Sequence, residues 1–132
     1  MVRRDEEDSS RLPCVLVVDD DEASRHLVEI ALRGLEVEVV SCADPTAVLD
    51  LVLEWAPDAI VLDVMMPGMD GATVVKRIHE AQLEKTPKLV LWSALDSGAL
   101  QQRAQECGAD AVALKLAGPS VLTRQLVEWL GL

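Results

Sequence analysis

The sequence contains no phenylalanine and no tyrosine, so tryptophan supplies its only large aromatic rings. The core of this 132-residue chain must therefore be filled by Val, Leu, Ile and Ala, together with Trp55, Trp92 and Trp129. A chain of this length buries roughly two-thirds of the surface that it exposes when unfolded, which is enough for one domain without crosslinks. The aliphatic composition favours β-branched strands covered by Leu- and Ala-rich helices.

Basic residues are also scarce, with 12 Lys and Arg against 23 Asp and Glu and a net charge of −11. Proteins that bind nucleic acid neutralise phosphates with clustered Lys and Arg, so this charge argues against a nucleic-acid partner. Divalent cations and basic protein surfaces are easier for such a chain to bind, because their charge is opposite to its own.

Long apolar runs are missing as well. No run approaches the roughly 20 residues that a membrane-spanning helix needs, and the N-terminus lacks the apolar region of a signal peptide. The cysteines Cys14, Cys42 and Cys107 are odd in number and lack CxxC spacing. This pattern favours reduced thiols over disulfides or a metal–thiolate site. We therefore expect a cytoplasmic protein without membrane contact.

The first twelve residues, MVRRDEEDSSRL, are charged and poor in apolar side chains. A segment of this composition cannot bury enough apolar surface to order itself, so we expect a mobile leader over residues 1–12. Residues 13–132 are then expected to form one folded domain.

Five short segments rich in apolar residues recur along the chain. They are CVLVV at 14–18, EVEVVS at 36–41, DAIVL at 58–62, KLVLW at 88–92 and DAVAL at 110–114. Four of them are nearly continuous apolar runs, which are typical of parallel strands covered on both faces. Between and after them, apolar residues recur every three or four positions, which predicts helices. Strict alternation of strand and helix predicts an α/β fold with a doubly wound parallel sheet.

Polar residues follow these strands at their carboxyl ends, where sheets of this kind bind ligands. Asp19 and Asp20 follow the first strand, Asp63 the third, Ser93 the fourth and Lys115 the fifth. Carboxylates gathered at one edge repel one another unless a cation lies among them, and their oxygens suit Mg²⁺ or Mn²⁺. A cation, a lysine and a hydroxyl can together neutralise a phosphoryl group that a carboxylate attacks. Asp63 stands alone after its strand and is the best candidate nucleophile.

Four segments, taken in order, resemble the receiver domain of two-component response regulators, the CheY-like superfamily. They are VLVVDDDE at 15–22, IVLDVMMPGMDG at 60–71, LWSA at 91–94 and GADAVALK at 108–115. Each alone is a weak signal, but four in this order, each at a strand end, are specific. The resemblance runs from about Cys14 to the C-terminus. It implies a flavodoxin-like (βα)5 sheet of five strands in the order 2-1-3-4-5.

The resemblance also implies roles for individual residues at the metal site. Asp63 matches the aspartate that accepts the phosphoryl group, and Asp20 matches the acidic residue that binds Mg²⁺ directly. Asp19 matches the neighbouring acid that acts through water. Met65 matches the position whose backbone carbonyl completes the metal site.

Ser93 and Lys115 match the hydroxyl and the lysine that contact the phosphoryl group in such domains. The resemblance implies that a sensor histidine kinase or a phosphotransfer protein donates phosphoryl to Asp63 in the presence of Mg²⁺. The acidic charge excludes DNA as a direct target, so we expect output by contact with a downstream protein. Such a domain takes up phosphoryl from a donor and loses it slowly, so we do not expect an enzyme.

The sequence departs from the receiver pattern at two positions near its end. Val112 stands where receivers usually carry Tyr or Phe, and Leu116 stands where they carry a proline with a cis peptide bond. A cis bond before a residue other than proline costs about 3 kcal/mol, so we expect a trans bond and a rerouted loop after Lys115. These departures favour an alternative, a receiver-fold binding module that does not switch by phosphorylation.

Two further hypotheses concern reactivity. The apolar side chains of Met65 and Leu95 flank the phosphoryl position in the receiver pattern, so they are expected to hinder attacking water and lengthen the phosphorylated lifetime. A Mg²⁺-dependent phosphohydrolase with an aspartyl intermediate is disfavoured. The candidate nucleophile Asp63 is followed two residues later by Met65, and not by the general acid that a DxD hydrolase places there.

Overall fold

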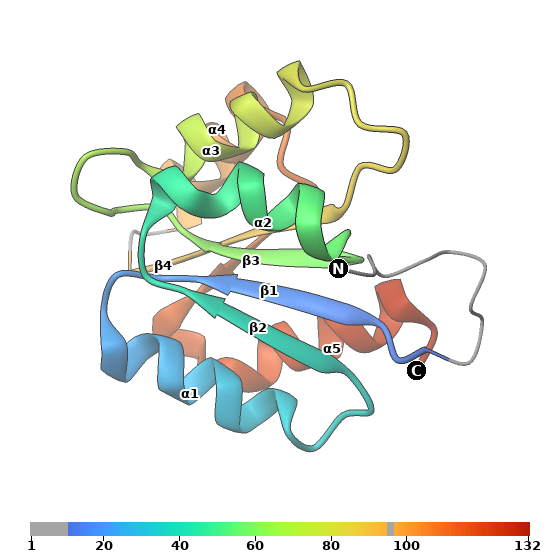
Figure 1. Ribbon diagram of the computed structural model, residues 1–132. Coiled ribbons are helices and arrows are strands. Elements are labelled where there is room, and N and C mark those ends of the chain that lie inside the picture. The colour runs from blue at the N-terminus through green and yellow to red at the C-terminus, as the bar shows by residue number, and fades with distance from the viewer. Residues whose placement is uncertain (1–10, 95–96) are drawn as a thin grey trace.

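The computed structural model describes residues 11–94 and 97–132. Most of the predicted leader, residues 1–10, and Leu95 lie outside the described residues. The described residues contain one sheet of five parallel strands in the order β2-β1-β3-β4-β5, as predicted (Figure 1). The strands are β1 at Cys14–Val18, β2 at Glu38–Cys42, β3 at Ala59–Asp63, β4 at Lys88–Ser93 and β5 at Ala111–Leu114.

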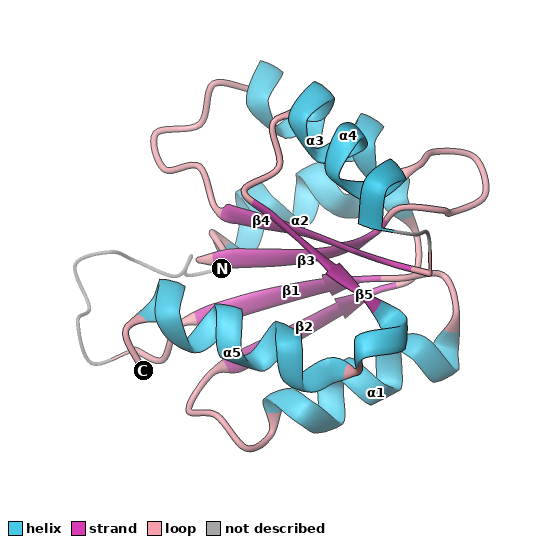
Figure 2. Cartoon of the chain, turned by 180° about the vertical axis from the view of Figure 1, so that it is seen from behind, coloured by secondary structure: helices cyan, strands magenta, loops and turns pink. Residues whose placement is uncertain are grey.

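Helices cover both faces of the sheet. On one face lie α1 at Glu22–Leu32 and α5 at Pro119–Leu130, and on the other lie α2 at Val48–Trp55, α3 at Gly71–Glu80 and α4 at Ser97–Cys107 (Figures 1 and 2). Two 3-10 turns, η1 at Pro45–Ala47 and η2 at Lys115–Ala117, precede α2 and α5. Among the described helices, none is both long enough and apolar enough to cross a bilayer.

The central strands are buried on both faces because their side chains alternate between two cores. Leu16 and Ile60 belong to the core under α2, α3 and α4. Val17 and Val61 belong to the core under α1 and α5. Successive residues of a strand point to opposite faces, so a strand that feeds two cores must be apolar at every position. This explains why the runs at 14–18 and 58–62 show no polar alternation.

The second strand differs from its predicted range of 36–41. The ladder between β1 and β2 begins where Cys14 pairs with Glu38, and it ends where Val18 pairs with Cys42. The preceding residues have no strand beside them at that point, although their alternating pattern looks the same. β3 and β4 each extend one residue beyond prediction, so that Asp63 and Ser93 are their last residues.

Asp58 joins three strands at the amino-terminal edge of the sheet. Its Oδ2 accepts a hydrogen bond of 2.7 Å from the backbone N–H of Cys14, and its Oδ1 accepts one of 2.6 Å from Lys85 Nζ. Its backbone N–H donates to the Cys14 carbonyl, and its own carbonyl accepts from the N–H of Lys88. The carboxylate of Asp58 therefore closes a part of the ladder that backbone groups alone do not close.

Replacing Asp58 with alanine is expected to lower the free energy of unfolding by about 1–3 kcal/mol, because it removes the acceptor of a buried backbone N–H. Asp58→Asn is the matched control. Its amide oxygen can still accept a hydrogen bond from the N–H of Cys14. Asp58→Asn should therefore lose less than half of the unfolding free energy that Asp58→Ala loses. Urea denaturation of the three proteins measures the difference, and equal midpoints for Asp58→Ala and the wild type would contradict the assignment.

Candidate functional site

Three acidic residues meet at the carboxyl edge of the sheet. Asp19 directly follows β1, and Asp63 ends β3 on the neighbouring strand. Asp19 is 1% exposed and Asp63 is 5% exposed, whereas Asp20 lies at the surface. One carboxylate oxygen from each of the three residues lies within 4.8 Å of the other two. This spacing lets one cation contact all three, which is the arrangement that the strand ends predict.

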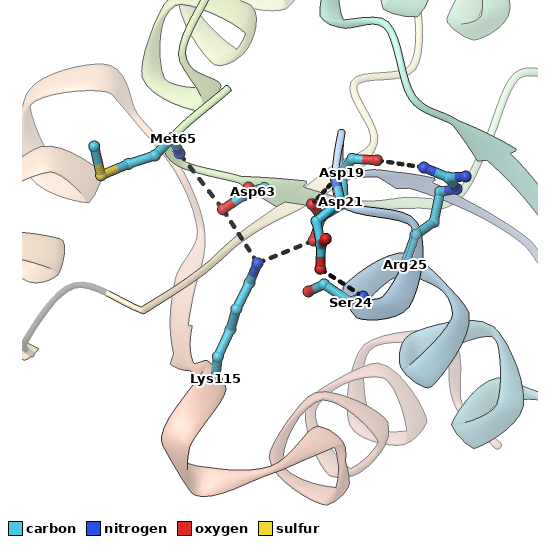
Figure 3. A network of polar contacts seen from close by, with 7 residues as sticks. All are labelled: Asp19, Asp21, Ser24, Arg25, Asp63, Met65 and Lys115. Carbon is cyan, nitrogen blue, oxygen red and sulfur yellow. Dashed lines mark hydrogen bonds and ion pairs between the residues drawn. The ribbon is translucent and has the colours of Figure 1, made fainter. Parts of the chain in front are cut away.

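Lys115 reaches this acidic pocket from η2, directly after β5. Its Nζ lies 3.0 Å from Asp19 Oδ2 and 3.5 Å from Asp63 Oδ1, between the two carboxylates (Figure 3). The peptide bond that follows it is trans, as predicted, and the chain turns through η2 before α5 begins. Leu116 points into solvent and is 92% exposed, so the residue that replaces the usual proline leaves the lysine in place.

The surroundings of Asp63 disfavour its ionised form. Burial, followed by the charge of Asp19, raises the pKa of Asp63 to about 6, while Lys115 and the backbone N–H of Met65 oppose the shift. That N–H lies 3.4 Å from Asp63 Oδ1, a weak hydrogen bond. The carboxylate is therefore a group whose charge an added cation would stabilise.

A glycine sets how closely α3 approaches Asp63. Gly71 donates its N–H to the carbonyl of Val64 over 2.9 Å. A Cβ at this position would collide with the carbonyl oxygen of Asp63 and lie 3.2 Å from the Cα of Val64. Sequence reasoning did not identify Gly71 as a site residue. The available signal was a glycine at the first helical position, where better helix formers are preferred.

The loops after β1 and β3 both lead into helices that begin with an aspartate cap. Asp21 is the N-cap of α1, and its side chain accepts a hydrogen bond from the N–H of Ser24. Asp70 accepts one from the N–H of Thr73, and it also contacts Arg103 of α4 at 3.1 Å. These caps hold the loops that carry the acidic residues.

Ser93 and Met65 lie next to the pocket, but their predicted roles stay predictions. Ser93 is 2% exposed and follows Trp92, the residue that pairs in register with Asp63. Met65 follows Asp63 by two residues and is 63% exposed. Val112, at the position where an aromatic residue is usual, is half-buried and packs against the core under α2, α3 and α4.

Arg25 is the second residue that sequence reasoning missed. Its Nη1 donates a hydrogen bond of 2.7 Å to the backbone carbonyl of Asp19 (Figure 3). An arginine in the first turns of a helix has no distinctive pattern. Its contact with the pocket becomes apparent only when α1 is placed beside the end of β1.

Comparison with known families agrees with this geometry. The family model described as "Response regulator receiver domain" matches residues 15–127. The chain belongs to the receiver domain family. The matched range falls within the predicted domain of 13–132 and includes every residue of the pocket. Receiver domains pair with histidine kinases, and an acidic triad such as Asp19, Asp20 and Asp63 is typical of their Mg²⁺ site.

Individual relatives show the same similarity. This receiver is 39% identical over 95 residues to the response regulator PleD of Caulobacter vibrioides, which covers 72% of this chain and 21% of PleD. It is 32% identical over 127 residues to the sensor protein GacS of Pseudomonas syringae pv. syringae, covering 94% of this chain and 14% of GacS. The chain therefore spans only 21% and 14% of the lengths of these two relatives.

Among solved structures, a putative response regulator from Chloroflexus aurantiacus superposes with a TM-score of 0.84 at 30% identity. The match covers 92% of this receiver and 100% of that chain.

The raised pKa of Asp63 predicts that Asp63→Asn stabilises the receiver above pH 6 when no divalent cation is present. The folded state holds the Asp63 proton more tightly than the unfolded state does, so ionisation of Asp63 costs stability as the pH rises. This cost grows between about pH 4 and pH 6 and then levels off, at roughly 1–3 kcal/mol. The asparagine removes it.

Urea denaturation in EDTA, from pH 4.5 to pH 7.5, measures this difference between Asp63→Asn and the wild type. Asp50→Asn removes an exposed carboxylate on α2 and serves as the control, with little expected effect at any of these pH values. A stability difference for Asp63→Asn that does not change across this range would contradict the assigned shift.

Proposed function

We propose that this receiver accepts a phosphoryl group on Asp63 from a sensor histidine kinase or a phosphotransfer protein, in a reaction that requires Mg²⁺. A downstream protein then reads the phosphorylated surface. One observation carries the proposal. Lys115 Nζ lies 3.0 Å from Asp19 and 3.5 Å from Asp63, within a cluster of acidic oxygens at the carboxyl edge of the sheet. This arrangement combines a nucleophile, a fixed cation and a site for a second cation.

The residues present fit a divalent metal. Carboxylates of Asp19, Asp20 and Asp63, with the backbone carbonyl of Met65, would hold Mg²⁺ through oxygen atoms alone, and Mn²⁺ has a similar preference. When bound, the ion neutralises charge on the phosphoryl oxygens and lowers the repulsion between them and the pocket.

The chemical step is proposed to involve Asp63, Lys115 and Ser93. An ionised oxygen of Asp63 attacks phosphorus and forms the new O–P bond, while the bond from phosphorus to the donor's histidine nitrogen breaks. The electron pair of that bond stays on the imidazole. In this proposal Lys115 and the hydroxyl of Ser93 contact phosphoryl oxygens, Lys115 as a point charge and Ser93 as a hydrogen-bond donor. Burial keeps Asp63 poorly solvated and fixed at its strand end.

Output is proposed to occur through protein contact. The net charge of −11 makes nucleic acid an unsuitable direct target. The similarity to a segment of the sensor protein GacS supports a place in a phosphorelay.

A second candidate function is supported by Val112. In receivers, the aromatic ring that is usual at this position rotates together with the strand-end hydroxyl, here that of Ser93. Valine has no ring that could do so. In that case the chain is a receiver-fold binding module that does not switch by phosphorylation. The two functions differ in one measurable respect. A switching receiver binds its partner with an affinity that changes when Asp63 is phosphorylated. A binding module binds equally well when Asp63 is replaced by alanine.

Incubation with acetyl phosphate and Mg²⁺ is expected to add a single phosphoryl group to the wild-type receiver, stable in acid and labile in base. Intact-mass spectrometry detects the adduct. Asp63→Asn should give none, because the nucleophile is lost, and EDTA should abolish it in the wild type. No adduct on the wild type, or an unchanged adduct on Asp63→Asn, would contradict the proposal. Many phosphates released per protein would instead favour a hydrolase.

The phosphorylated receiver is expected to persist for minutes or longer, because Met65, two residues after Asp63, carries an exposed apolar side chain in place of a polar one. Met65→Asn offers polar groups that can orient water, and it should shorten the half-life severalfold. Met65→Leu keeps the apolar surface and is the matched control. Decay of the intact-mass adduct after removal of acetyl phosphate gives the three half-lives. A wild-type half-life of seconds, or no difference between the two variants, would count against this explanation.

A further inference from the structure

Asp19 is held at every polar group, and Arg25 supplies one of these contacts. The backbone N–H of Asp19 donates to the carbonyl of Cys42 over 3.1 Å. Its Oδ1 accepts from the N–H of Asp21 at 2.9 Å, and its Oδ2 accepts from Lys115 Nζ at 3.0 Å. Its carbonyl accepts from Arg25 Nη1 at 2.7 Å, the shortest of the four. This carbonyl lies one residue past the end of β1. The hydrogen bond from Arg25 therefore holds the backbone at the start of the loop, where the strand ends.

Arg25 is itself fixed on two sides. Its backbone N–H donates to the carbonyl of Asp21 in the first turn of α1. Its Nε lies 3.7 Å from Glu29 Oε1, and the same oxygen accepts a hydrogen bond of 2.8 Å from Ser41 Oγ of β2. The side chain of Arg25 is 18% exposed. A guanidinium held between α1, β2 and the end of β1 loses little further freedom when it supports the pocket.

The two basic side chains at the pocket, Lys115 and Arg25, contact it in different ways. Lys115 binds carboxylate oxygens, which a metal or a phosphoryl group would also need. Arg25 binds a backbone carbonyl, so it adds positive charge near the acidic cluster without occupying any carboxylate oxygen. In the proposed transfer Lys115 turns from Asp19 to a phosphoryl oxygen. Asp19 then keeps its contacts with Cys42, Asp21 and Arg25 alone.

We propose that Arg25 is a positioning residue of this site. It holds the backbone of Asp19, so that the Asp19 carboxylate stays in place for the divalent cation while Lys115 moves to the incoming phosphoryl group. This inference rests on the proposed function. To the proposed function it adds Arg25, a residue outside the acidic cluster. Metal affinity and the rate of phosphoryl transfer depend on this residue.

The test compares Arg25→Ala and Arg25→Gln with Arg33→Ala. Arg33 caps the carboxyl end of the same helix, and its side chain is exposed, so its loss changes the net charge equally at a site remote from the pocket. Isothermal titration with Mg²⁺ gives the metal affinity. The rate of adduct formation from acetyl phosphate at saturating Mg²⁺ gives the transfer step.

Both Arg25 variants are expected to bind Mg²⁺ roughly 5- to 20-fold more weakly than the wild type and to be phosphorylated more slowly by a similar factor, since a charge-assisted hydrogen bond is lost. Arg33→Ala should stay within about twofold, the effect of a distant screened charge. Arg25→Lys keeps a charged donor and should recover part of the loss.

Amide hydrogen exchange in the metal-free protein provides a readout that does not depend on phosphorylation. The N–H of Asp21 donates a hydrogen bond to Asp19 Oδ1. This amide should exchange faster in Arg25→Ala and Arg25→Gln, while the amides of β3 keep their protection. If Arg25→Ala loses protection throughout the sheet, Arg25→Gln is judged by the same criteria.

Metal affinity and transfer rate in the Arg25 variants equal to those of Arg33→Ala would overturn the inference and leave the proposed function standing. A wild-type receiver that forms no Asp63 adduct would overturn the proposed function, and this inference with it.

Discussion

The placement of two carboxylates side by side at the edge of a buried sheet governs the rest of this structure. Asp19 and Asp63 are almost wholly withdrawn from water, and like charges at such sites repel strongly. Lys115 offsets this repulsion from a position 96 residues away from Asp19 in sequence. Only a fold that brings the ends of β1, β3 and β5 to one edge can supply that contact. The strand order is therefore also the condition for a stable acidic pocket.

Acidic residues at the two edges of the sheet show how surroundings decide the role of a side chain. Asp58, at the amino-terminal edge, has each carboxylate oxygen bonded to a donor of its own. The Cys14 N–H and Lys85 thus compensate its charge, and the carboxylate completes the ladder. Asp63, at the opposite edge, faces another acid and shares its lysine with it. The same chemical group is structural where its donors suffice and reactive where they do not.

Much of this could be predicted from the sequence, because the relevant signals are local. Apolar runs marked the strands, and reading the residues that follow them located Asp19, Asp20, Asp63 and Lys115. The start of β2 was placed two residues early, since an alternating pattern does not reveal where its partner strand begins. The contributions of Gly71 and Arg25 could not be predicted, because both act on backbone carbonyls that tertiary packing brings near them.

The absence of tyrosine and phenylalanine has an optical consequence at this site. Emission from the protein can come only from tryptophan, and of its three rings Trp92 alone is buried, while Trp55 and Trp129 are partly exposed. Trp92 pairs in register with Asp63, and its Nε1 has no hydrogen-bond partner among the described residues. A small shift of β4 would change the polarity around this indole. The chain therefore carries its own fluorophore, one strand away from the carboxylate, without any label.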